Sequence, residues 1–264
     1  MQKYLLLLLT TMLTPLLALD LELDMGMGLY YTGAKGQIDY VGESFQGSNA
    51  KADLIPSGQF YIWADVKSKN PYLPRARFEY LKVSADGDSN AHLEISNQEL
   101  MDLIDQAGLN DQNWNSYLQH NMYDFILYYD FLEKSAWPTV GVGLGYRIFD
   151  YIYIMDIDIS DISGTQFGDR DDSSAPIVYL NTRYEAPSLN MGFEADAKMY
   201  LSDSSIYDWR IKMDLMFEVD ADTMAGLEFG YRGQYYSLAG GDVENVKGDM
   251  SYQGVFVGGT IHFK

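Results

Sequence analysis

The sequence contains no cysteine among its 264 residues. The chain therefore forms no disulfide bond and has no thiol that could carry a lipid. It also lacks a long apolar run beyond its first 18 residues, which excludes a membrane-spanning helix of about 20 apolar residues. Basic residues are scarce, since 18 Lys and Arg stand against 38 Asp and Glu, for a net charge of −20. This acidity argues against nucleic acid and anionic lipid as partners.

Histidine is scarce as well. His92, His120 and His262 lie far apart and show no metal-ligand spacing, so the sequence predicts no metal site and no cofactor. Two acidic segments, residues 168–174 and 240–249, are interpreted as solvated loop tips. Weak calcium or magnesium binding at these loops, bridging lipopolysaccharide phosphates, is a hypothesis.

The first 18 residues form a separate unit. They read "MQKYLLLLLTTMLTPLLA", in which Lys3 precedes a leucine-rich run that ends near Ala18. This arrangement is typical of a secretory signal peptide. We therefore expect residues 1–18 to be a signal peptide and residues 19–264 to form one exported domain.

Beyond the signal, charged and apolar residues alternate, as in "WRIKMDLMFEV" at residues 209–219. A period of two predicts β-strands with two unlike faces. About ten such strands are expected, at residues 20–31, 54–66, 75–84, 121–132, 139–159, 176–186, 189–201, 206–219, 223–236 and 252–263.

The predicted connections between these strands alternate in length. Long ones at residues 32–53, 85–120, 160–175 and 237–251 alternate with short ones at 67–74, 133–138, 186–188 and 220–222, although the connection near residue 203 is also short. Tight turns at one end and long loops at the other are typical of an all-β, up-and-down transmembrane antiparallel barrel. In the second long loop, Ser96, Glu99 and Gly108 form the start and stop signals of a short helix.

The composition of the polar face indicates that it lines a lumen. This face holds six of the seven arginines but two of the eleven lysines. A confined interior favours arginine, because the guanidinium group pairs with carboxylates at a low desolvation cost. The predicted lumen charge network is Glu22, Asp24, Arg75, Arg77, Glu79, Asp124, Arg147, Arg183, Glu194, Asp196, Lys198, Arg210, Lys212, Asp214, Glu228 and Arg232, with Asp65, Asp130, Glu185, Asp208 and Glu218 on the same parity.

Aromatic residues gather near the predicted strand ends. They are Tyr30, Tyr31, Tyr72, Tyr151, Tyr153, Tyr200, Tyr207, Tyr235, Tyr236, Trp137 and Trp209. We interpret them as belts at the two membrane interfaces.

Residues 184–232 and the closing "GVFVGGTIHF" at 254–263 resemble a family of uncharacterised Gram-negative outer-membrane β-barrel proteins. The resemblance implies the barrel fold and an outer-membrane location. At that location we expect outer-membrane lipid and lipopolysaccharide as partners. It implies no activity. The aromatic Phe263 near the end of the last strand is typical of barrels recognised by the barrel-assembly machinery.

Three functional interpretations follow. The first is a barrel with a charge-filled lumen, in a structural or surface-interaction role or as a small selective channel. The second is a rim-active enzyme, a protease or lipid-modifying protein, in which His120 approaches Asp124. The third is a soluble secreted β-sandwich, which would show the same alternation. The sequence favours the first, because no paired acidic motif lies beside a histidine at matching strand ends.

Overall fold

The structure is a computed structural model and describes residues 21–41, 45–53, 55–95, 113–131, 138–159, 162–201, 205–238 and 246–263. Almost all of them lie in β-strands. The elements are β1 (Leu21–Val41), β2 (Phe45–Asp53), β3 (Ile55–Ser68), β4 (Arg75–Ile95), β5 (Asn113–Phe131), β6 (Thr139–Ile159), β7 (Ile162–Ala186), the 3-10 turn η1 (Pro187–Leu189), β8 (Met191–Tyr200), β9 (Ser205–Glu218), β10 (Thr223–Leu238) and β11 (Val246–Phe263). The predicted signal peptide and the predicted helix after Ser96 lie outside the described residues.

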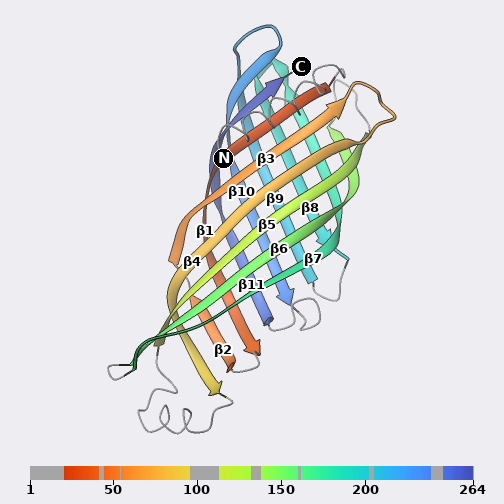
Figure 1. The fold of residues 1–264 in the computed structure, drawn as a ribbon. Coiled ribbons are helices and arrows are strands. Elements are labelled where there is room, and N and C mark those ends of the chain that lie inside the picture. Colours follow the sequence, from red (N-terminus) through yellow and green to blue (C-terminus); the bar gives the residue numbers. More distant parts are fainter. Residues whose placement is uncertain are drawn as a thin grey trace, which may run out of the picture.

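The strands form one closed antiparallel sheet. The first strand pairs with the last, β1 with β11, from Leu23 opposite Phe263 to Tyr40 opposite Val246. β2 and β3 follow one another between β1 and β4, so the eleven strands occupy ten positions around the barrel. This strand order confirms the expected ten-stranded barrel, whose closed shape is seen in Figure 1. A two-sheet sandwich is excluded, because a single sheet closes on itself.

Several strands are longer than the sequence indicated. β1 continues to Val41, β4 to Ile95, and β7 begins at Ile162, so most of the predicted long loops at 32–53, 85–120 and 160–175 are strand. Hydropathy marks only the apolar part of a strand, about 9 to 11 residues in a membrane barrel. Backbone pairing continues beyond that part, and the β6–β7 hairpin extends far past the barrel wall in Figure 1.

The barrel has one end with short connections, which we call the turn end, and an opposite loop end. Residues 69–74, 187–190 and 219–222 make described connections at the turn end, where β1 also begins and β11 also ends. Asn190 has a φ of 51° there, a conformation that Asn tolerates. In the β9–β10 turn the Asp222 N–H donates to Asp220 Oδ1 at 3.0 Å and lowers the pKa of that carboxyl group.

The two faces of the barrel wall have opposite compositions. Large apolar side chains are exposed on the outside, whereas charged side chains are buried inside. The exposed set includes Met27, Leu29, Phe60, Phe125, Leu127, Val142, Leu144, Leu180, Phe193, Ile211, Leu227, Phe229, Val255 and Val257. Within the described ranges, no helix has the length and apolar character needed to cross a membrane.

Candidate functional site

The lumen holds an ion-pair network that reaches across the barrel. Strand alternation points every second side chain inward, and the ten-stranded barrel brings inward charges from distant strands within contact. One continuous path of ion pairs runs through Arg183, Asp24, Arg75, Asp65, Arg77, Glu79, Lys198, Asp124, Arg147, Asp208 and Arg232.

Near the turn end, Asp24 joins three cationic or titratable groups. Its Oδ2 accepts from Arg75 Nη2 at 3.4 Å and from Arg183 Nη1 at 3.3 Å, and its Oδ1 contacts His262 Nδ1. Arg75 also binds Asp65 through Nε at 3.0 Å. Asp24 therefore links the open end of the lumen to the buried middle.

The middle of the network is the most crowded part. Arg77 donates to Glu79 at 2.7 Å and to Glu194 at 3.3 Å, and Arg210 donates to Glu194 at 3.0 Å. Arg210 also contacts Asp196 at 2.6 Å. The guanidinium fork meets several carboxylates at once, which a lysine ammonium does with less geometric precision.

Lys212 and Glu228 form a second part of the middle layer. Lys212 Nζ lies 3.2 Å from Glu228 Oε2 and 4.3 Å from the ring centroid of Trp63. Glu228 accepts further hydrogen bonds from Tyr61 Oη at 2.7 Å and from Trp63 Nε1 at 3.0 Å. The carboxylate of Glu228 is thus compensated although it is fully buried.

Toward the loop end, the network closes on Arg147. Its Nη2 donates to Asp124 and to Asp208, each at 2.6 Å. Arg232 donates to the same Asp208 at 2.9 Å, and Lys198 donates to Asp124 at 2.8 Å. Arg147 is fully buried and bridges the two carboxylates, each of which has a second cationic partner.

Glu22 is the member of the predicted charge set that the structure places apart from the network. Its carboxylate lies 3.8 Å from Lys67 Nζ, and both side chains are partly exposed. The physical reason is position, because Glu22 stands at the start of β1 and reaches the rim. Three inward acids outside the predicted network, Asp65, Asp130 and Asp208, do take part in the ion pairs. These three acids lie at the same alternate strand positions as the predicted network, and this parity is the sequence feature that indicates an inward side chain.

Above the charge network, on its loop side, aromatic rings fill the lumen. The His120 ring stacks on Phe149 with centroids 5.4 Å apart and meets Tyr236 at 5.1 Å and Tyr252 at 6.2 Å. Phe149 stacks in turn on Tyr200 at 5.5 Å. We call these five residues the aromatic layer. Arg147 lies 5.1 Å from the Tyr200 ring, so the aromatic layer rests directly on the charge network.

This layer corrects the interpretation of the strand-end tyrosines as interface belts. Tyr30, Tyr200 and Tyr236 are buried inside the barrel, whereas Tyr31, Tyr72 and Tyr235 are exposed. Trp209 and Tyr207 are exposed as well, while the side chains of Tyr151, Tyr153 and Trp137 lie outside the described residues. Each buried tyrosine has the same strand parity as an inward charge or glycine on its own strand. Strand parity therefore predicts whether a tyrosine lies inside or outside the barrel better than its distance from a strand end does.

The two described histidine side chains have different surroundings. His120 is fully buried within the aromatic layer, and Asp124, its expected partner, binds Arg147 and Lys198 instead. His262 contacts Asp24 near the turn-end rim. Thr260 is the hydroxyl residue lining the same space, and its Oγ1 donates to the Met25 carbonyl at 3.0 Å.

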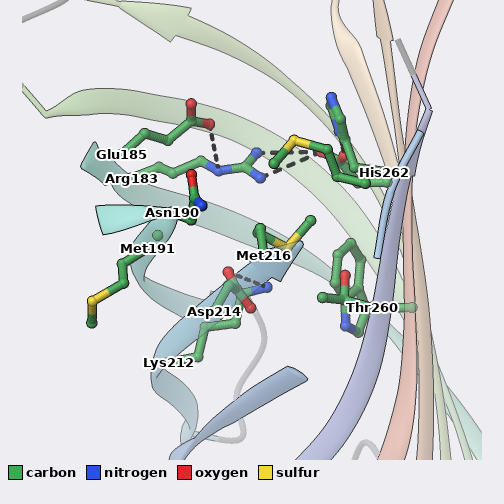
Figure 2. A pocket seen from close by; sticks show the side chains of 13 residues that line it. Arg183, Glu185, Asn190, Met191, Lys212, Asp214, Met216, Thr260 and His262 are labelled. Carbon is green, nitrogen blue, oxygen red and sulfur yellow. Dashed lines mark hydrogen bonds and ion pairs between the residues drawn. The ribbon is translucent and has the colours of Figure 1, made fainter. Parts of the chain in front are cut away.

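A cavity of about 360 Å³ opens at the turn end of the lumen. Figure 2 shows Arg183 crossing it between Glu185 and the neighbourhood of His262, with Asp214 and Lys212 on the opposite wall. The lining residues are Asp24, Trp63, Arg183, Glu185, Asn190, Met191, Gly192, Lys212, Asp214, Met216, Met224, Thr260 and His262. Met216 reaches into this space, whereas Met191 points away from it (Figure 2).

The arrangement has consequences for ligands. Across the part of the chain that the structure describes, no group of three or more His, Cys, Asp or Glu residues could hold a metal ion. The predicted acidic cation segments are only partly described: residues 168–174 continue β7, and Asp249 accepts a hydrogen bond from Tyr235 at 3.2 Å. The turn-end cavity has room for a small ligand.

Comparison with known proteins gives no family. No family model matches the chain, and no curated protein matches it either. Similar solved structures include the outer membrane protease OmpT from Escherichia coli, with 8% identity over 92% of this chain and 96% of that chain and a TM-score of 0.49. Neisserial surface protein A matches with 12% identity over 92% and 96% and a TM-score of 0.32.

A major outer membrane protein from Thermus thermophilus also matches, with 12% identity over 92% of this chain and 99% of that chain and a TM-score of 0.34. These similarities carry no argument about activity or location. The fold rests on the strand pairing itself.

Proposed function

We propose that this chain is an integral outer-membrane β-barrel protein whose lumen is closed, and that it has a structural or surface-interaction role. The observation that supports this most is the inverted wall, with apolar residues outside and charges inside. Soluble monomers rarely expose a contiguous apolar patch larger than a few hundred Å². In a bilayer the same outer surface is matched by hydrocarbon, and a closed barrel leaves no unpaired strand edge in lipid.

The proposed closure has two components. The predicted lumen charges and their partners fill the middle of the barrel with ion pairs, and the aromatic layer covers them on the loop side. Arg147, Lys198 and Glu228 are each no more than 1% exposed. A permeating ion would have to separate buried ion pairs, which is costly in a low-dielectric interior. This favours a closed barrel over the small selective channel.

In this proposal the turn end faces the periplasm and the loop end faces outward, as in other barrels of the outer membrane. The long β6–β7 hairpin would then project toward the exterior, beside lipopolysaccharide. Insertion by the barrel-assembly machinery is part of the same proposal. The enzyme alternative draws on the contact between Asp24 and His262, which places an acid beside a histidine at matching strand ends. We do not propose an activity from this pair, because Asp24 is also bound to Arg75 and Arg183 as part of the ion-pair network.

Planar-bilayer recording of the purified, folded protein tests the closure. We expect no stable open-channel steps above the leak of a protein-free bilayer. A large, weakly selective conductance would falsify the closed lumen.

The orientation has its own test, since the chain contains no cysteine. Asp220→Cys places one thiol in the exposed β9–β10 turn. A membrane-impermeant maleimide should label it only after the outer membrane has been permeabilised. Labelling on intact cells would reverse the proposed orientation, and recovery of the protein in the soluble fraction would reject the membrane location.

A further inference from the structure

The charged groups around the turn-end cavity are already paired with one another. Arg183 binds Asp24 at 3.3 Å and Glu185 at 3.5 Å, and Lys212 binds Asp214 at 3.3 Å. Most of these hard donors and acceptors are therefore engaged within the protein, although Asp214 Oδ1 is buried without a hydrogen-bond partner among the described residues. The wall also offers softer groups, namely the thioether sulfurs of Met216 and Met224 and one imidazole nitrogen of His262.

Strand register brings these soft groups together. Met224 on β10 lies directly opposite His262 on β11. On the other side, Met216 of β9 pairs with Gly226 of β10, which is two residues from Met224 on the same face. The Met216 sulfur lies over that glycine, because a Cβ built on Gly226 would come within 2.6 Å of it. The two thioethers and the imidazole thus border one side of the cavity.

His262 is held in a suitable orientation for binding. Its Nδ1 contacts Asp24 Oδ1, and Asp24 is opposite it in the β1–β11 register. Metal-binding histidines commonly donate one ring N–H to a carboxylate, which fixes the ring and leaves the other nitrogen as the ligand atom. Here the contact with Asp24 leaves Nε2 as that atom.

We infer that Met216 Sδ, Met224 Sδ and His262 Nε2 form a site for a soft monovalent metal ion, copper(I) or its redox-inert analogue silver(I). Thioether ligands select copper(I) over hard divalent ions, whereas imidazole accepts several metals. The cavity wall contributes three carboxylates, from Asp24, Glu185 and Asp214, against the two cations of Arg183 and Lys212. A monovalent cation therefore matches the net charge of the wall. The site does not depend on whether the lumen is closed.

The test uses the full folded barrel in detergent micelles, with folding checked by the heat-modifiable band on a gel. Copper(I) is offered anaerobically in competition with the chelator bicinchoninate. We expect one copper(I) ion per barrel. The variant Met216→Leu with Met224→Leu should bind more than about 100-fold more weakly, since loss of outer-shell partners alone typically reduces affinity 10- to 100-fold.

The matched control replaces two exposed outward methionines, Met27→Leu with Met199→Leu, and should retain wild-type affinity. Leucine conserves the volume of methionine, so all four changes should allow folding. X-ray absorption of the wild-type protein with copper(I) should show sulfur and nitrogen scatterers. The inference is overturned if the wild type does not compete with the chelator, if sulfur scattering is absent, or if both double variants lose affinity equally.

Discussion

The two ends of the lumen are filled in opposite ways. At the loop end, His120 and four aromatic rings pack into a layer from which solvent is excluded. At the turn end, charged side chains surround an open cavity of about 360 Å³. Both ends use the same inward parity of the same strands. The difference shows that strand alternation assigns a side chain to the lumen without deciding whether its surroundings are dry or wet.

Two arginines provide the strongest comparison of the ends. Arg147 is fully buried and compensates Asp124 and Asp208, whereas the Arg183 side chain is 25% exposed in the cavity. Arg147→Ala should lower the free energy of unfolding by about 3 to 5 kcal/mol, because it leaves one buried negative charge uncompensated, although Asp124 keeps Lys198 and Asp208 keeps Arg232. Arg183→Ala should cost about 1 kcal/mol or less, since water replaces the guanidinium group. Urea unfolding in lipid vesicles measures the free energy of unfolding of both variants. Equal losses of stability would contradict the assignment of Arg147 to a solvent-excluded site and of Arg183 to a solvated one.

On the outer wall, the cost of an introduced arginine can be compared between the middle of the barrel and the turn end. Leu144 and Leu189 are both 65% exposed, but Leu144 lies within β6 and Leu189 in the turn η1. Leu144→Arg should reduce stability by about 2 to 4 kcal/mol if it faces mid-bilayer, and Leu189→Arg by about 0 to 1 kcal/mol near the interface. The yield of heat-modifiable, folded protein in the outer membrane and vesicle unfolding provide the measurements. A barrel in water would show small effects at both positions.

Chemical modification of histidine compares the solvent accessibility of the two ends and has the smallest expected effect on the protein. Diethyl pyrocarbonate should modify His262, whose side chain is 21% exposed, and leave the fully buried His120 unmodified. Tyr236→Ala should open the aromatic layer and permit modification of His120. Tyr235→Ala, at the adjacent outward position, is the control and should not. Mass spectrometry of the digested protein quantifies both sites, and modification of His120 in the wild type would show that the loop end is not dry.

The sequence predicted more of the fold than of the site. Alternation in β9 separated Arg210 and Lys212 from Ile211 before any strand partner was known, and the count of about ten strands was correct. Strand ends were wrong where polar segments continued the pairing, as in β7. The aromatic layer was also missed, because Tyr200 and Tyr236 stand near strand ends, where an interface belt is equally expected.

By itself, the sequence determined which side chains share a face, because a period of two is a local property of an extended backbone. Only the tertiary structure decided which of them meet. Arg147 reaches Asp208 across 61 residues of chain, and Tyr61 reaches Glu228 across 167. Such contacts depend on the closure of β1 on β11 and on the stagger between strands. The pairing of β9 with β10 and of β10 with β11 brought Met216 near Met224 and placed Met224 opposite His262, and so gave a place in the lumen to an apolar residue on the polar face of β9.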